Sequence, residues 1–197
     1  MHGHLIVFEG LDQSGKQTQA EHLRDRLTSL GYTVRLVSFP DYRTHIGGEI
    51  ARALAGEREY TPDVMQLLYV ANRYEWKAEL QQMLDQGWFV VCDRYLASSV
   101  AYGEAFGLDA AWLTDIQRFL PRPSVTIMLD IAPETAVTRK SIGRDRYERD
   151  ILLQTRVRES YRRLAAEDAW LLLDGDRPKA DIAAEVFTRL ESRLSLP

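Results

Sequence analysis

The nine residues from Gly10 to Thr18 are the segment whose types and spacing say most about chemistry. They read Gly-Leu-Asp-Gln-Ser-Gly-Lys-Gln-Thr, follow an apolar run over residues 5–8 and precede a stretch with apolar residues at helical spacing. Glycines let successive backbone N–H groups converge on an anion, and a helix start adds its positive dipole end. The segment therefore predicts a phosphate-binding loop that contacts a nucleotide through Gly10, Leu11, Asp12, Gln13, Ser14, Gly15, Lys16, Gln17 and Thr18.

One position departs from the usual form of such a loop. The residue after the lysine is commonly Ser or Thr, whose hydroxyl binds Mg²⁺, but here it is Gln17, and Thr18 comes one residue later. Either the metal is held elsewhere, through phosphates, water and carboxylates, or the site is altered. We favour the first alternative because the rest of the loop is intact. Glu9 and Asp93, expected at the ends of adjacent strands, are then the carboxylates that could hold the metal.

Size and composition restrict the class of protein. A chain of 197 residues with 45% apolar content fits one domain, residues 1–197, with a sizeable core. A net charge of −4 argues against general nucleic-acid or membrane-surface binding. We expect no signal peptide, no membrane span, an inert buried thiol at the single cysteine, Cys92, and a cytoplasmic location.

Strand and helix signals alternate along the chain, which predicts a doubly wound α/β fold with a parallel sheet. The expected strands are mostly continuous apolar runs, at residues 5–8, 34–39, 89–93, 125–131 and 170–173. Besides the helix after the loop, we expect one long helix over residues 63–86, with Thr61 as N-cap and Gly87 as stop. Further helices are expected over residues 46–55, 111–120, 133–139, 147–166 and 180–194.

Charged residues cluster where these strands end. The second predicted strand is followed by Asp41-Tyr42-Arg43, and the third ends in Asp93-Arg94-Tyr95. Ligands of open parallel sheets bind at the carboxyl ends of the strands, so these cations are expected beside the phosphate loop. None of the four histidines shows a metal-ligand or catalytic spacing.

Several motifs in order resemble the thymidylate kinase family of P-loop kinases. They are FEGLDQSGKQTQ at residues 8–19, Phe39-Pro40, the helix segment LLYVANR at 67–73, Asp93-Arg94-Tyr95, RKSIGRDRYE at 139–148 and LLLDGD at 171–176. The resemblance implies a five-stranded P-loop kinase fold and transfer of the γ-phosphoryl group from ATP, with Mg²⁺, to dTMP, a step that supplies dTTP for DNA synthesis. It also implies a homodimer.

The resemblance carries roles to matching residues. Lys16 would follow the transferred phosphoryl group, Arg94 would grip the acceptor phosphate, and Asp12 would meet the sugar 3′-hydroxyl. Thymine would be contacted by Tyr69 and Arg73, with Ser98 and Ser99 near the base, and Tyr102 would crowd the 2′ position of the sugar. Many members have arginine at the position of Tyr42, so either Tyr42 or Arg43 would contact the acceptor phosphate.

The segment of residues 139–150 resembles the family's lid. Some members carry an arginine after the loop aspartate, but this chain has Gln13, so the extra cation would come from the lid. Arg144 is the first choice among Arg139, Lys140, Arg144 and Arg146, and Tyr147 would also contact the acceptor. The alternatives are a kinase for another nucleotide or for a deoxynucleoside, with Asp41 as base, and a degenerate nucleotide-binding protein.

Overall fold

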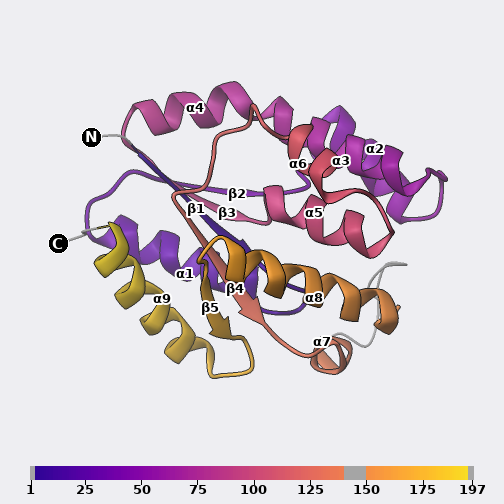
Figure 1. Ribbon diagram of the computed structural model, residues 1–197. Helices are drawn as coiled ribbons and strands as arrows, with labels where there is room; N and C mark the ends of the chain where they lie inside the picture. Colours follow the sequence, from indigo (N-terminus) through magenta and orange to yellow (C-terminus); the bar gives the residue numbers. More distant parts are fainter. Residues whose placement is uncertain (1–2, 140–149, 195–197) are drawn as a thin grey trace.

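A computed structural model describes residues 3–139 and 150–194 and contains one five-stranded parallel sheet (Figure 1). The strand order is β2-β3-β1-β4-β5, so the first strand lies at the centre and the chain winds outward on both sides. The strands are β1 (His4–Glu9), β2 (Val34–Ser38), β3 (Phe89–Asp93), β4 (Val125–Asp130) and β5 (Leu171–Asp174). The predicted doubly wound α/β fold is confirmed, with strand boundaries that differ from the expected ones by at most one residue.

Helices cover both faces of the sheet. On one face α1 (Lys16–Ser29) and α9 (Lys179–Leu194) pack on side chains such as Ile6, Phe8 and Ile127. On the other face lie α4 (Lys77–Asp85), α5 (Leu96–Ala105) and α8 (Ile151–Glu167), which cover Leu5, Val7 and Met128 (Figure 1). Burial on both faces explains why β1 and β3 are almost continuously apolar.

The expected long helix is divided at Trp76. The structure has α3 (Pro62–Glu75) and α4 as separate helices, with Trp76 between them at φ −90° and ψ −7°. The indole N–H of Trp76 donates to Asp41 Oδ2 at 3.1 Å, in the loop after β2. Thr61 lies at the predicted N-cap position of α3, although its side chain makes no capping hydrogen bond to the backbone.

The remaining helices are α2 (His45–Leu54), α6 (Ala110–Asp115) and α7 (Pro133–Arg139). The predicted helix over residues 111–120 is therefore shorter and begins one residue earlier. The helix α5 was not expected from the sequence. Within the described ranges, no helix combines the length and the apolar character that crossing a bilayer requires.

Candidate active site

The phosphate loop joins β1 to α1, and two glycines give it its shape. Gly10 has φ 136° and Gly15, the N-cap of α1, has φ 95°, values that side chains rarely adopt. A Cβ on Gly10 would lie 2.4 Å from the carbonyl oxygen of Leu129 in β4, so only glycine lets the loop start this close to the sheet. The loop leads directly into the N-terminus of α1, and the positive end of a helix dipole favours an anion.

Lys16 is buried beneath this loop. The residue is only 5% exposed, and its Nζ donates to the carbonyl oxygen of Leu11 at 2.7 Å. Burial, followed by the charge of Arg94, lowers the pKa of Lys16 to about 8. The ammonium group therefore has a strong tendency to acquire an anionic partner.

Gln17 lies on the exposed side of α1, where its Nε2 donates to Glu21 Oε1 at 3.0 Å. At the end of β3, Asp93 Oδ1 is buried and has no hydrogen-bond partner in the described part of the chain, and burial raises the pKa of Asp93. Among the described residues there is no cluster of three or more His, Cys, Asp or Glu able to hold a metal ion.

Glu9, the other predicted carboxylate, is fully buried and engaged by the start of α5. Its Oε1 accepts from the backbone N–H of Tyr95 at 2.8 Å, and Oε2 accepts from the hydroxyls of Ser98 at 2.7 Å and Tyr161 at 3.0 Å. That Glu9 binds a metal stays a prediction, and a metal ion would have to compete with these hydrogen bonds.

Arg94 links the phosphate loop to α5. Its backbone has φ 65°, and its N–H donates to the Phe8 carbonyl oxygen at 2.9 Å. One guanidinium nitrogen, NH2, donates to Asp12 Oδ1 at 2.7 Å, while Tyr102 donates its hydroxyl to Asp12 Oδ2 at 3.0 Å. Burial raises the pKa of Asp12, but the charges of Arg94 and Lys16 outweigh burial and hold this pKa well below its usual value.

A cavity of about 90 Å³ adjoins Arg94 and brings the predicted acceptor residues together. Its lining includes Asp12, Tyr42, Tyr69, Arg73, Arg94, Ser98, Ser99 and Tyr102. No binding role was expected for the residues that complete the walls, which are Phe39, Pro40, Leu54, Gln66 and Phe106. Phe39 and Pro40 form one of the motifs that resemble the family and lie at the end of a predicted strand, whereas Leu54, Gln66 and Phe106 carry no such signal.

Arg73 is a buried cation in this cavity. It is 3% exposed, NH1 donates to Ser99 Oγ at 2.7 Å, and Nε has no hydrogen-bond partner in the described structure. Burial lowers the pKa of Arg73, and no carboxylate is paired with it among the described ion pairs. The guanidinium edge is therefore available to a polar ligand group.

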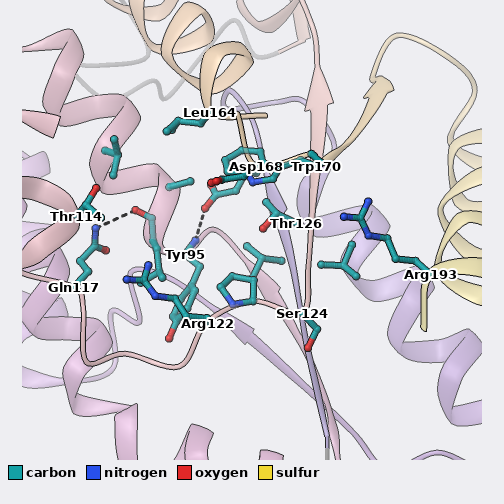
Figure 2. Close-up of a pocket in the computed structure, with 18 residues that line it drawn as sticks. Tyr95, Thr114, Gln117, Arg122, Ser124, Thr126, Leu164, Asp168, Trp170 and Arg193 are labelled. Carbon is teal, nitrogen blue, oxygen red and sulfur yellow. Dashed lines mark hydrogen bonds between the residues drawn. The ribbon is translucent and has the colours of Figure 1, made fainter. Parts of the chain in front are cut away.

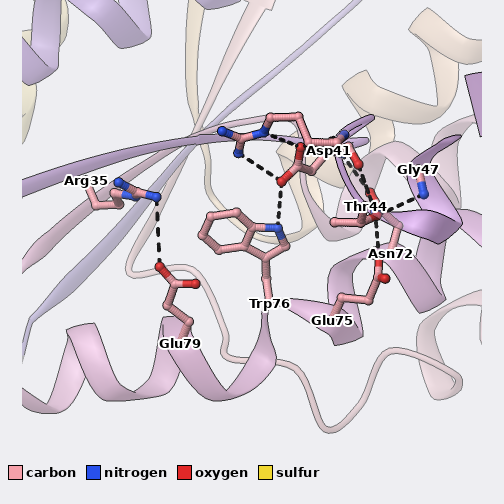
Figure 3. A network of polar contacts seen from close by, with 9 residues as sticks. Arg35, Asp41, Thr44, Gly47, Asn72, Glu75, Trp76 and Glu79 are labelled. Atoms are coloured by element: carbon pink, nitrogen blue, oxygen red, sulfur yellow. Dashed lines mark hydrogen bonds and ion pairs between the residues drawn. The ribbon is translucent and has the colours of Figure 1, made fainter.

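The loop after β2 separates Tyr42 from Arg43. The Arg43 guanidinium, 78% exposed, makes two bonds to Asp41, at 2.8 Å to Oδ1 and 2.9 Å to Oδ2, and does not line the cavity. Asn72 Oδ1 accepts from the backbone N–H of Asp41 at 2.8 Å, and Asn72 Nδ2 donates to Thr44 Oγ1 at 2.9 Å (Figure 3). This network fixes the loop with Tyr42 toward the cavity.

The predicted lid lies largely outside the described residues, and Lys140, Arg144, Arg146 and Tyr147 fall there. Arg139 is described at the end of α7. Its guanidinium donates to the carbonyl oxygens of Gln13 at 3.1 Å and Gly175 at 3.0 Å, and to Asp176 Oδ1 at 3.0 Å. It thus bridges the phosphate loop and the segment after β5.

A second cavity, of about 330 Å³, lies between α5, the segment before β4 and the end of α8 (Figure 2). Its polar lining includes Thr114, Arg122, Thr126 and Asp168. Its described lining includes no residue of the phosphate loop, whereas Asp12 of that loop and Arg94 line the first cavity.

Comparisons with known proteins agree with this geometry. The model of the family described as thymidylate kinase matches residues 8–186. A thymidylate kinase from Plasmodium falciparum is 36% identical over 93% of this chain and 88% of its own length, and one from Schizosaccharomyces pombe is 39% identical over 84% and 78%. The structure of a thymidylate kinase from Candida albicans superposes with a TM-score of 0.83 at 29% identity, covering 97% of this chain and 92% of that chain.

Proposed function

The chain belongs to the thymidylate kinase family and transfers the γ-phosphoryl group of ATP to dTMP, and we propose that the phosphate loop and the cavity beside Arg94 carry out this transfer. The observation that supports this assignment most is that the two parts of the site touch: Asp12 of the phosphate loop lines the cavity, and its carboxylate meets the Arg94 guanidinium at 2.7 Å. Donor and acceptor phosphates would then meet at this pair.

The chemistry asks mainly for position and charge neutralisation. The attacking group is a phosphate oxygen, which is already largely ionised near neutral pH, so no general base is needed. Catalysis then depends on aligning two anions and stabilising the charge that develops between them. Lys16 would stabilise the transferred group, and Arg94 would hold the acceptor phosphate with its planar donors.

The remaining roles follow from the cavity lining. Tyr69 and Arg73 would contact thymine, with Ser98 and Ser99 near the base, and Asp12 and Tyr102 would meet the sugar. Tyr42 rather than Arg43 would contact the acceptor phosphate, because Arg43 is bound to Asp41. The loop residues 10–18 would bind ATP, and Arg144 and Tyr147 of residues 139–150 stay sequence predictions.

Asp93 is the protein group that best fits Mg²⁺. A buried carboxylate oxygen without a hydrogen-bond donor is unusual, and a cation would satisfy it. When bound, the ion would neutralise charge on the β- and γ-phosphates. Phosphate oxygens and water would supply most other ligands, since Gln17 bonds to Glu21.

A deoxynucleoside kinase would need a base for a sugar hydroxyl, and Asp41 was the candidate. Its carboxylate is bound by the Arg43 guanidinium, which with the N–H of Trp76 holds the pKa of Asp41 below its usual value. A carboxylate engaged in this way is a poor proton acceptor. This observation favours a phosphate acceptor over a hydroxyl acceptor.

The test is a coupled assay of ADP release with ATP and Mg²⁺ across the ribo- and deoxynucleoside monophosphates, with thymidine as a further acceptor. We expect the largest kcat/KM with dTMP and no turnover of thymidine. The panel also measures the acceptor range, since the Candida albicans structure is described as revealing the origin of broad substrate specificity. Higher kcat/KM with thymidine than with dTMP would overturn the proposal.

We further propose a single domain with a lid, a homodimer and a cytoplasmic location, which stay predictions from the sequence. The apolar side chains of Leu67, 46% exposed on α3, and Phe119, 61% exposed after α6, support a self-association surface.

A further inference from the structure

We propose that Tyr161, on α8, is a positioning residue that orients the Arg94 guanidinium for the acceptor phosphate. The inference rests on the proposed function, because it assigns Arg94 to that phosphate. Tyr161 is 67 residues from Arg94 in the chain, and no motif in the sequence points to it. Its ring is fully buried among apolar side chains of α5 and α8, so its hydroxyl has a fixed place.

The two ends of the Arg94 guanidinium have different partners. NH1 donates to the Tyr161 hydroxyl at 3.1 Å and to Ser98 Oγ at 3.2 Å, which uses both of its hydrogens. NH2 donates to Asp12 Oδ1 at 2.7 Å. The Asp12 side chain is 32% exposed and belongs to the ligand cavity, whereas Tyr161 and Ser98 are buried. A ligand can therefore exchange with Asp12 at NH2 while NH1 stays bound.

Glu9 sets the direction of these hydrogen bonds. Its Oε2 accepts from Ser98 Oγ at 2.7 Å and from the Tyr161 hydroxyl at 3.0 Å, and the two hydroxyls are 2.8 Å apart. Each hydroxyl has one hydrogen. Because both hydrogens are directed to the Glu9 carboxylate, the oxygen lone pairs of Tyr161 and Ser98 are left to accept from Arg94.

The arrangement connects a buried anion to a cation through neutral hydroxyls. Chains of hydrogen bonds that end on charged groups are stronger than neutral ones, because each bond polarises the next. A phenylalanine at position 161 would keep the packing of the ring and remove one of the two acceptors at NH1. The guanidinium would then lose part of its orientation while keeping its charge.

The test is Tyr161→Phe, with dissociation constants measured by calorimetry for dTMP, thymidine and ATP. We expect the Kd for dTMP to rise about tenfold, the scale of one hydrogen bond to a charged group. The Kd for thymidine, which has no phosphate, and the Kd for ATP should stay unchanged. A merely structural role for Tyr161 would not separate dTMP from thymidine in this way.

The matched control is Tyr74→Phe, which removes another partly buried hydroxyl, bonded at 3.1 Å to the carbonyl oxygen of Ile116. We expect it to leave all three constants unchanged. In an Arg94→Ala background, Tyr161→Phe should have no further effect on the Kd for dTMP, because the two residues act through one contact.

The inference is overturned if Tyr161→Phe leaves the Kd for dTMP unchanged, raises the constants for dTMP and thymidine equally, or weakens dTMP binding as much without Arg94 as with it. Each result can occur in a protein that still phosphorylates dTMP, so it would leave the proposed function intact. The converse also holds. If the acceptor assay showed no preference for dTMP, a loss of dTMP binding in Tyr161→Phe that spares thymidine would still be measurable.

Discussion

At the scale of single residues, two cations of the site, unlike Arg94, are paired with neutral groups and not with a carboxylate. Lys16 bonds to a backbone carbonyl and Arg73 to a serine hydroxyl. Burying a charge in this way costs stability unless a partner arrives. Lys16 and Arg73 can therefore each gain an anionic or polar partner when a nucleotide binds, and this gain favours binding.

Replacing Lys16 with methionine should abolish most catalysis without unfolding the protein. Losing one electrostatic contact to a transition state typically lowers kcat by about 10²–10³-fold. Steady-state turnover with saturating ATP and dTMP measures this change, with circular dichroism as the control for folding. Undiminished kcat in the folded variant would refute the role assigned to Lys16.

The same variant should change how stability depends on pH. The folded pKa of Lys16 is about 8, below the 10.5 of the unfolded chain, so the folded state loses this proton first as the pH rises. The wild type is therefore penalised fully below pH 8, and the penalty fades between about pH 8 and 10.5. Urea denaturation should show Lys16→Met most stabilised relative to wild type near pH 7, with the difference shrinking toward pH 10.5. A difference that grows over this range would contradict the assignment.

At the scale of elements, α2 packs its first turn directly on the loop that carries Tyr42. A Cβ on Gly47 would lie 1.8 Å from the backbone oxygen of Asp41, whereas nothing lies within 4 Å of a Cβ on Gly48. The helix and the loop can therefore meet only at a glycine.

This contact gives a prediction with a built-in control. Gly47→Ala should destabilise the protein by about 3 kcal/mol and raise the KM for dTMP, because the overlap displaces the loop. Gly48→Ala, one residue further along the same helix, should stabilise it by up to about 1 kcal/mol, the usual preference for alanine inside a helix. Chemical denaturation of both variants is the measurement, and equal effects would exclude the contact as the cause.

The strands and the polar residues that follow them were predictable from the chain itself, whereas the helix residues of the site, such as Tyr69, Arg73 and Tyr102, were predicted from the resemblance to the family. Strands buried on both faces are apolar throughout, and their carboxyl ends place polar residues on one edge of the sheet. Most of the predicted acceptor residues accordingly line one cavity. Arg43 does not, because its pairing with Asp41 depends on the fold of the loop.

Two helix predictions failed for physical reasons. The helical spacing continues across Trp76, so the break, tied to Asp41 by a hydrogen bond 35 residues away in the chain, has no local signal. The helix α5 reads Leu-Ala-Ser-Ser-Val-Ala-Tyr-Gly-Glu-Ala and is buried at most of its positions. A helix without an extended polar face has no amphipathic pattern to reveal it.

At the scale of the whole molecule, the exposed ring of Phe119, after α6, lies beside the junction of α3 and α4. Lys77 Nζ lies 5.9 Å from the centre of the Tyr74 ring and 5.6 Å from that of Phe119, so these elements adjoin. Two copies of the chain that meet through the same region around Phe119 would form a two-fold symmetric dimer.

We expect sedimentation equilibrium to give a dimer for the wild type and a monomer for Phe119→Asp. Leu30→Asp introduces the same charge at an exposed apolar residue elsewhere, 43% exposed at the end of α1, and should remain dimeric. A monomeric wild type would contradict the proposed assembly.

The ion pair between Asp12 and Arg94 also bears on ligands that a cell holds in excess. Orthophosphate that captured Arg94 would leave the aspartate without its counterion in a partly buried place, which is unfavourable. Under the proposed roles dTMP avoids this cost. Its phosphate binds Arg94, and its sugar hydroxyl donates to Asp12 at the place that Arg94 leaves. Small inorganic anions should therefore be weak competitors of the acceptor at Arg94.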